Sequence, residues 1–204
     1  RAARSEKQAQ QWGSMAGSTR GTTAWAWWIA GLVLVLGAIP VQAQPQSQDT
    51  CLKLVFGRFC LGGDTGSLQQ EGPRPVIRLP DGERLALVFQ DGPERIYVLA
   101  FRDRIYKVVR RYRGSSQLRF DDLYGVLREK YGPGDERSRF PSYADTPSRR
   151  LSSIRRGEGQ AFYYWKPADS WHIELTWTRE MGISLAYVAT ERDRQQQTAA
   201  NSGL

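Results

Sequence analysis

The chain has 204 residues, a formal net charge of +8, two cysteines and a single histidine. This length suffices for one domain whose buried core needs no metal. Two thiols and one imidazole cannot complete the four-ligand shell of a structural zinc ion without carboxylates, and the pattern singles none out. We therefore expect no metal site, no cofactor and no catalytic set, since no Gly-x-Ser-x-Gly motif accompanies the single histidine.

The amino-terminal part has the pattern of an export signal. Residues 1–14 precede Met15 and are interpreted as an upstream or non-native segment. Residues 15–43 then combine one arginine, an uncharged run over 24–39, and small residues before a cleavage site at Gln44, which is the order of a signal peptide. The alternative is an inner-membrane anchor through 24–39, although that run is shorter than the roughly 20 residues of a membrane span. We expect a periplasmic or secreted protein with no membrane span after cleavage.

Export affects what we expect of the two cysteines and of the positive charge. Cys51 and Cys60 are predicted to form a disulfide, because an exported protein meets oxidising conditions. Residues 44–204 hold 25 basic and 20 acidic residues. A basic balance often indicates nucleic acid, but for an exported chain we expect instead an anionic envelope polymer or an acidic protein surface. A solvated basic surface without any partner is the alternative.

Alternating apolar residues and turn signals predict an antiparallel meander in the first half of residues 44–190, which we take as a single domain. Residues 52–62 are expected to form one strand with a bend at Gly57, and Asp64–Arg74 a loop. The following strands are predicted over Pro75–Leu79, Arg84–Gln90, Arg95–Phe101 and Arg104–Tyr112.

The last of these strands carries a run of cationic side chains. If the strand alternates regularly, Lys107, Arg111 and Arg113 share one face, and Arg104 and Arg110 take the other. The run, which also includes Arg102, is therefore not expected to form one continuous stripe.

A helix follows the meander. Phe120, Leu123, Leu127 and Tyr131 recur at spacings of three and four, which predicts an amphipathic helix that ends at Gly132 and Pro133. Asp121 and Asp122 are then expected in the first helical turn, where carboxylates are favourable without any catalytic role.

Residues 133–159 are rich in Arg, Ser, Pro, Asp and Gly and are predicted to form a long loop. Such a loop can wrap an anionic partner as it becomes ordered. Solvated loop charge is the alternative. The candidate binding residues in this loop are Arg137, Arg139, Arg149, Arg150, Arg155 and Arg156.

Three further strands are predicted over Gln160–Trp165, Trp171–Thr178 and Ile183–Thr190, followed by a disordered tail at 191–204. Alternation places Phe162 and Tyr164 on one face of the first of these strands, so both are candidate binding residues; core or edge packing is the alternative. His172 falls on the polar face of its strand and is expected to be a surface histidine.

Together these elements predict an α+β fold. We expect a curved antiparallel sheet of about seven strands with one amphipathic helix packed on one face, preceded by the signal-peptide helix. The Leu123 and Leu127 side of the helix should meet the Trp171 face of its strand.

Three stretches in this order carry a resemblance to known proteins: Tyr97–Tyr106, Phe120–Pro133, and the pair Trp171–Leu175 with Ile183–Tyr187. The pattern is similar to uncharacterised exported periplasmic proteins of bacteria. More loosely, it resembles outer-membrane assembly lipoproteins and secreted β-lactamase inhibitor proteins. The resemblance covers Tyr97–Thr190 and carries over no catalytic residue.

The functional expectation is a non-enzymatic exported protein, either a protein-interaction module or an anionic-polymer-binding module of the envelope. A secreted enzyme inhibitor is one alternative. A hydrolase that uses carboxylates the pattern does not identify is the other.

Overall fold

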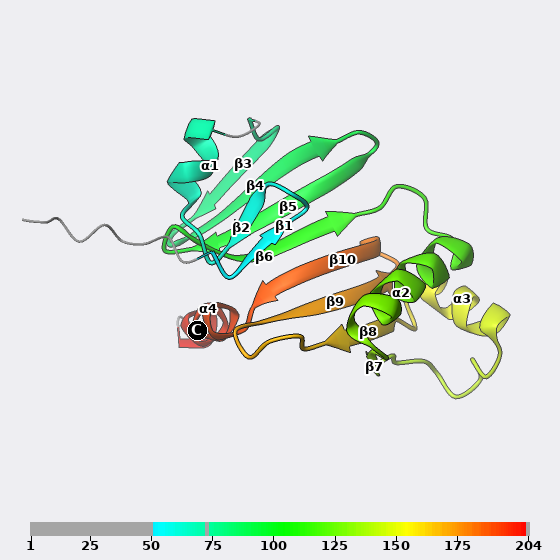
Figure 1. Cartoon of the computed structure of the whole chain (residues 1–204). Helices are drawn as coiled ribbons and strands as arrows, with labels where there is room; N and C mark the ends of the chain where they lie inside the picture. The colour runs from blue at the N-terminus through cyan, green and yellow to red at the C-terminus, as the bar shows by residue number, and fades with distance from the viewer. Residues whose placement is uncertain (1–50, 72–73, 203–204) are drawn as a thin grey trace, which may run out of the picture. The chain divides into compact units, whose positions relative to one another are not determined.

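The computed structural model describes residues 51–71 and 74–202, and the signal-peptide prediction lies outside these residues. The main element is an eight-stranded antiparallel sheet in the order β3-β4-β5-β6-β10-β9-β8-β7 (Figure 1). Its strands are β3 (Ile77–Asp81), β4 (Arg84–Asp91), β5 (Glu94–Phe101), β6 (Arg104–Arg111), β7 (Asp135–Glu136), β8 (Ala161–Trp165), β9 (Trp171–Thr178) and β10 (Gly182–Ala189). The predicted α+β class is confirmed.

The sheet consists of two meanders joined at one seam. Strands β3 to β6 pair in sequence order, as do β7 to β10, and the two sets meet where β6 pairs with β10. The predicted meander strands are present because alternating apolar residues and short turns specify them locally. The expected number of about seven strands is too low, because the sheet gains the short edge strand β7 and a separate hairpin forms.

That hairpin consists of β1 (Lys53–Val55) and β2 (Phe59–Leu61), where the sequence predicts one bent strand. The predicted disulfide between Cys51 and Cys60 is confirmed and ties the start of the hairpin to β2. Phe59 and Leu61 are fully buried, and β2 packs against both β6 and β10. The hairpin therefore covers the seam of the sheet.

Helix α2 (Gln117–Tyr131) lies over the second meander, as predicted (Figure 1). It begins earlier than expected, because the Ser116 hydroxyl accepts the Arg119 N–H and caps the helix there. Asp121 and Asp122 consequently lie beyond the first turn. Phe120 and Leu127 are buried in the core that also contains Trp171, so the predicted contact between helix and sheet is confirmed.

The predicted loop at 133–159 is wrong in part, because it contains β7 and the helix α3 (Pro147–Arg156). The Thr146 side chain accepts the Arg149 N–H, Pro147 occupies the first turn, and Gly157 closes the helix in the left-handed conformation. Ile154 anchors α3 in the core, so its arginine-rich composition does not prevent folding. A shorter helix, α1 (Thr65–Glu71), likewise replaces part of the predicted loop at 64–74.

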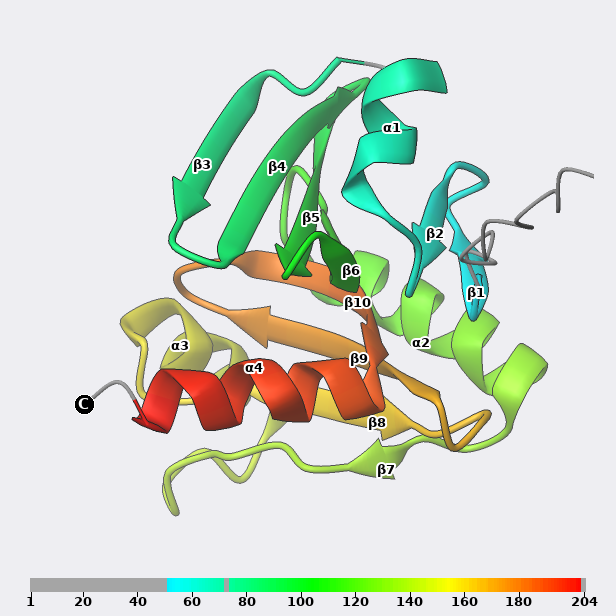
Figure 2. The same ribbon diagram turned by 90° about the vertical axis from the view of Figure 1, so that its left-hand side faces the viewer.

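The predicted disordered tail is also wrong, because α4 (Thr190–Ser202) follows β10 directly. It contacts β6, β9 and β10 (Figure 2). Trp171, Ile173 and Leu175 lie in the core on one face of the sheet, which we call the core face. We call the opposite face the outer face; α4 covers one end of it. In the described part of the chain, no helix has the length and apolar character of a membrane span.

Candidate functional site

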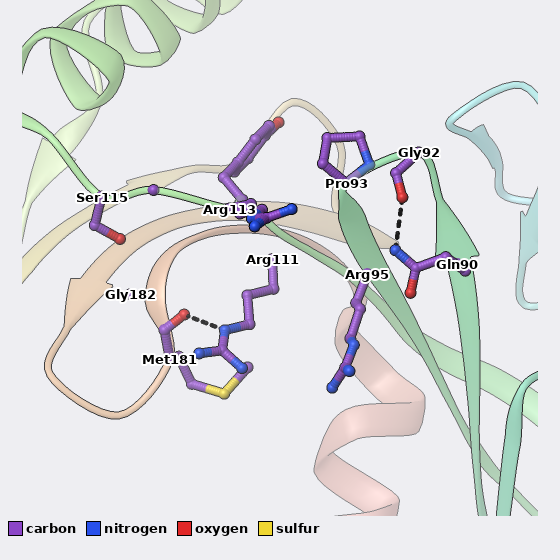
Figure 3. A pocket seen from close by; sticks show the side chains of 11 residues that line it. Gln90, Gly92, Pro93, Arg95, Arg111, Arg113, Ser115, Met181 and Gly182 are labelled. Carbon is purple, nitrogen blue, oxygen red and sulfur yellow. Dashed lines mark hydrogen bonds between the residues drawn. The ribbon is translucent and has the colours of Figure 1, made fainter.

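A cavity of about 460 Å³ lies where the β4–β5 turn, the end of β6 and the β9–β10 turn meet. Its lining includes three guanidinium groups, from Arg95, Arg111 and Arg113, with the Ser115 hydroxyl beside them. Figure 3 shows the Arg95 and Arg111 side chains extending from neighbouring strands toward the same side of the sheet. We call this cavity the arginine pocket.

The arginine pocket concentrates positive charge in an unfavourable arrangement. Arg95 and Arg111 are direct partners in the β5–β6 register, so their side chains leave the sheet next to each other. Like charges directly opposite one another in an antiparallel pair are destabilising. Among the described residues that line the pocket, none is acidic. The pocket therefore lacks an internal counter-charge.

Other cations of the same strands are neutralised. Lys107 pairs with Glu174 at 2.7 Å, and Arg110 pairs with Asp91 and Glu94. Within the described ranges, 51–71 and 74–202, Arg95 and Arg113 make no ion pair. The contrast marks the pocket as a place where an external anion can supply the missing charge.

Polar contacts fix the pocket's geometry. Arg111 donates from Nε to the Met181 carbonyl oxygen at 2.9 Å, which leaves its terminal nitrogens available. The Ser115 Oγ accepts the Ile183 N–H at 2.9 Å, so its own proton remains available for donation. The Gln90 amide is occupied, because it donates to the Gly92 and Glu94 carbonyls. The available donors are thus guanidinium and hydroxyl groups, which suit carboxylate, sulfate or phosphate oxygens.

The sequence did not predict this site, because the pairing of Arg95 with Arg111 depends on an irregularity in the β5–β6 register. A register shift between Leu99 and Ala100 places Arg95 opposite Arg111. Had the register set by the Phe101–Arg104 pair continued without that bulge, Arg95 would face Arg110 instead. The cationic run around Arg111 was visible in the sequence, but its partner on β5 was not.

The predicted loop arginines separate into two groups, and the first lies on α3. Arg149 pairs with Asp145 at 2.7 Å and Arg156 with Glu158 at 2.9 Å, both at exposed positions. Arg150 lies over the Phe140 ring, 5.1 Å from its centroid. Arg155 is exposed and makes no ion pair among the described residues. The helix thus holds much of its charge in local pairs.

The second group lies along β7, β8 and the segment after β7. The Arg137 guanidinium lies 3.9 Å above the Tyr164 ring and also pairs with Asp135. Arg139 bridges Gln160 through its backbone, while its side chain is exposed. Phe162 and Tyr164 are half-buried. Register and alternation place all four candidates on the outer face, opposite to Tyr163, which packs against Tyr124.

His172 is not the surface histidine that the sequence predicts. It is only 8% exposed, because α4 covers its end of the outer face. Its Nδ1 lies 3.1 Å from the Thr190 hydroxyl and its Nε2 lies 3.3 Å from a Glu174 oxygen. The alternation that places it opposite to Ile173 was correct, but the helix that buries it was not predicted.

This cluster perturbs two carboxylates. Burial by itself would raise the pKa of Glu174, but the hydrogen bonds from His172 and Lys107 outweigh it and lower the pKa to about 2. In Asp193 of α4, burial raises the pKa, and the nearby Lys107 opposes that rise only in part. Glu174 is therefore held as a carboxylate that neutralises Lys107 beneath the helix.

A histidine between a hydroxyl and a carboxylate has the composition of a hydrolytic triad. However, His172 is buried beneath α4, and among the described residues neither it nor Thr190 lines the arginine pocket. The same part of the chain contains no group of three or more His, Cys, Asp or Glu residues arranged to hold a metal ion.

Comparisons with known proteins do not place this chain in a family. No family model matches the sequence, and no curated protein matches it. A crystal structure of a cysteine-rich secretory protein from Staphylococcus aureus is similar with a TM-score of 0.37 and 13% identity, over 64% of this chain and 45% of that one. An extracellular protein containing a SCP domain from Bacillus anthracis gives a TM-score of 0.36 and 13% identity, over 66% and 46%. This chain thus spans less than half the length of either protein.

Proposed function

We propose that this protein is an exported, non-catalytic module that binds anionic groups at the arginine pocket. The observation that carries the proposal is the direct opposition of Arg95 and Arg111 in a cavity with no acidic lining residue in the described chain. The two like charges destabilise the folded protein when the pocket is empty. An anionic ligand that binds between them removes this repulsion and adds charge-assisted hydrogen bonds.

The exported location is supported by the disulfide. Cys51 and Cys60 form a bridge that closes a short loop over the seam of the sheet. Such bridges persist in oxidising compartments and are rare where thiols are kept reduced. An anionic partner of an exported protein belongs to the cell envelope or its surroundings, where acidic polysaccharides and acidic protein surfaces occur.

The proposal is tested by retention of the purified protein on heparin agarose, which presents sulfate and carboxylate groups. The double variant Arg95→Gln/Arg111→Gln should elute at a clearly lower NaCl concentration than the unchanged protein. The matched control Arg149→Gln/Arg155→Gln removes the same formal charge from α3 and should elute close to the unchanged protein. This control also tests the α3 arginines as an alternative site.

Two results contradict the proposal. The unchanged protein flowing through at low salt would show that it has no anion site. Equal loss of retention in the two double variants would show that net charge, rather than the arginine pocket, controls binding.

A further inference from the structure

The strand registers place a row of polar and aromatic side chains across the outer face, beginning at the arginine pocket. Successive direct partners from β5 to β8 are Arg95, Arg111, Ser184, Thr176 and Phe162. Beyond β8, the Arg137 N–H donates to the Phe162 carbonyl, which places Arg137 at the end of the row. We call this set the outer-face row. It runs perpendicular to the strands, with arginines at both ends, although Arg137 is already paired with Asp135.

A second, parallel line of residues lies beside the row. Gly182 of β10 pairs with Thr178 of β9. The β8–β9 register places Gln160 beside Thr178, and Gln160 in turn bridges to Arg139. Arg113 lines the arginine pocket together with Gly182. The Thr178 hydroxyl accepts the Met181 N–H, so its proton can be donated outward. This line also has arginine at each end and neutral hydrogen-bonding groups between.

Helix α4 leaves both lines open. Its residues Glu191 to Ser202 form a surface pocket with Phe101 and Arg102, at the β5–β6 turn. That turn is at the opposite end of the strands from Arg95 and Arg111. Figure 1 shows α4 beside the end of β10 toward which the strand runs, whereas the row crosses β10 near its beginning.

The two ends of the row are separated by several strands. Neighbouring strands lie about 4.8 Å apart, so the distance from β5 to β7 is roughly 24 Å. A single small anion cannot contact both arginine ends. An extended chain with repeated acidic groups can contact both, and its middle would lie over the Thr176 hydroxyl and the Phe162 ring.

The groups in the middle favour one class of chain. The Thr178 hydroxyl and the Gln160 amide match the hydroxyl groups of sugars. The Thr176 hydroxyl shares a hydrogen bond of 2.7 Å with the buried Ser184 hydroxyl, which leaves one further acceptor position on the pair. The half-buried ring of Phe162 offers a flat apolar surface of the kind on which the C–H face of a pyranose packs. An acidic peptide would use the arginine ends equally well but would have no particular need for the hydroxyls or the ring.

We propose that the outer-face row binds an extended acidic polysaccharide that lies across the strands from the arginine pocket to Arg137 and Arg139. This assignment rests on the proposed anion-binding function and gives it a ligand class. Arg95, Arg111 and Arg113 hold acidic groups at one end, Arg139 holds them at the other, and Phe162 packs against a sugar ring between them.

The test uses labelled galacturonate dimer and an oligomer of about eight units, long enough to span the row, with binding followed by fluorescence anisotropy at low salt. The oligomer should bind at least about tenfold more tightly than the dimer, because both arginine ends contribute. Arg139→Gln should weaken oligomer binding by roughly threefold and leave dimer binding unchanged. The matched control Arg155→Gln removes an arginine of α3 that is also exposed and makes no ion pair among the described residues, and it should change neither.

A second variant, Phe162→Leu, keeps an apolar side chain and removes the aromatic ring. It should weaken binding of the galacturonate oligomer but not of poly-glutamate of similar charge. The thermal unfolding of Phe162→Leu is measured in parallel to show that the variant folds. If it folds poorly, the effect of Arg139→Gln on oligomer binding still tests the proposal, because Arg139 is exposed.

Three results would refute polysaccharide binding along the outer-face row, and each differs from the result that would refute anion binding at the arginine pocket. They are equal affinities for dimer and oligomer, equal effects of Arg139→Gln and Arg155→Gln, and poly-glutamate binding as tightly as galacturonate. In each case, retention on heparin that depends on Arg95 and Arg111 would still support the arginine pocket. Loss of that dependence would remove both proposals.

Discussion

Replacing Arg95 by glutamine should make the unliganded protein slightly more stable. The change removes one of two arginines that are direct partners in the β5–β6 register and carry no counter-charge between them. Two unit charges about 7 Å apart would repel by roughly 0.6 kcal/mol in water and by about 2.4 kcal/mol at an effective dielectric constant near 20. Because Arg95 is exposed, the lower figure applies, and direct cross-strand like-charge pairs cost a similar amount. We expect a gain of about 0.5 kcal/mol, or about 1–2 °C in Tm.

Urea unfolding of the unchanged protein and of Arg95→Gln, at low salt and at about 0.5 M NaCl, measures this effect. The gain should be largest at low salt and should shrink at high salt, because salt screens the repulsion. Inorganic phosphate at low ionic strength should stabilise the unchanged protein more than the variant, since a ligand stabilises only the form that binds it. The reasoning is refuted if the variant is less stable at low salt, or if phosphate stabilises both proteins equally.

Two further predictions concern stability. Glu174 has a folded-state pKa of about 2, below its ordinary value of 4.5, so it contributes stability above about pH 4.5 that is lost as the pH falls toward 2. Glu174→Gln should therefore lower the unfolding free energy by up to about 3 kcal/mol at pH 6. It should also flatten the fall in unfolding free energy between pH 5 and pH 2, which urea titrations measure. An unchanged acid profile would contradict the pairing of Glu174 with Lys107. Replacing Cys51 and Cys60 by alanine should lower the unfolding free energy by about 2.5 kcal/mol, because the open loop regains entropy, and denaturation with and without reductant checks this against the unchanged protein.

Local signals in the sequence predicted the elements that local interactions define. The strands of both meanders alternate clearly and are bounded by turn residues, and the helix at Gln117–Tyr131 has a regular apolar stripe. Helix α3 was missed because its arginine and serine content hides the signals that were present, a capping Thr146 before Pro147 and a closing Gly157. Helix α4 contains no buried residue, so its sequence has no apolar stripe that would reveal it. It lies instead against polar groups from distant strands, since its Asp193 is close to Lys107 of β6 and Glu174 of β9.

The candidate site depended on information of a different kind. Phe162, Tyr164, Arg137 and Arg139 were expected to be candidate binding residues, and the structure places them on one face. Arg95 became part of a site only through its pairing with Arg111, and that pairing depends on the bulge near Ala100. A slip of one residue in a strand changes every cross-strand partner, so a site built from partners cannot be recognised before the register is known.

The seam between β6 and β10 has a consequence for how the chain assembles. Each meander joins neighbours in sequence and can form early, whereas the seam joins residues far apart, such as Arg111 and Ser184, and should form later. The bridge between Cys51 and Cys60 can close at any time, but the hairpin it holds finds its place only when both β6 and β10 are present. Until then, two strand edges stay unpaired and are able to pair with other chains. The risk of aggregation during folding is therefore greatest in the interval before this seam closes.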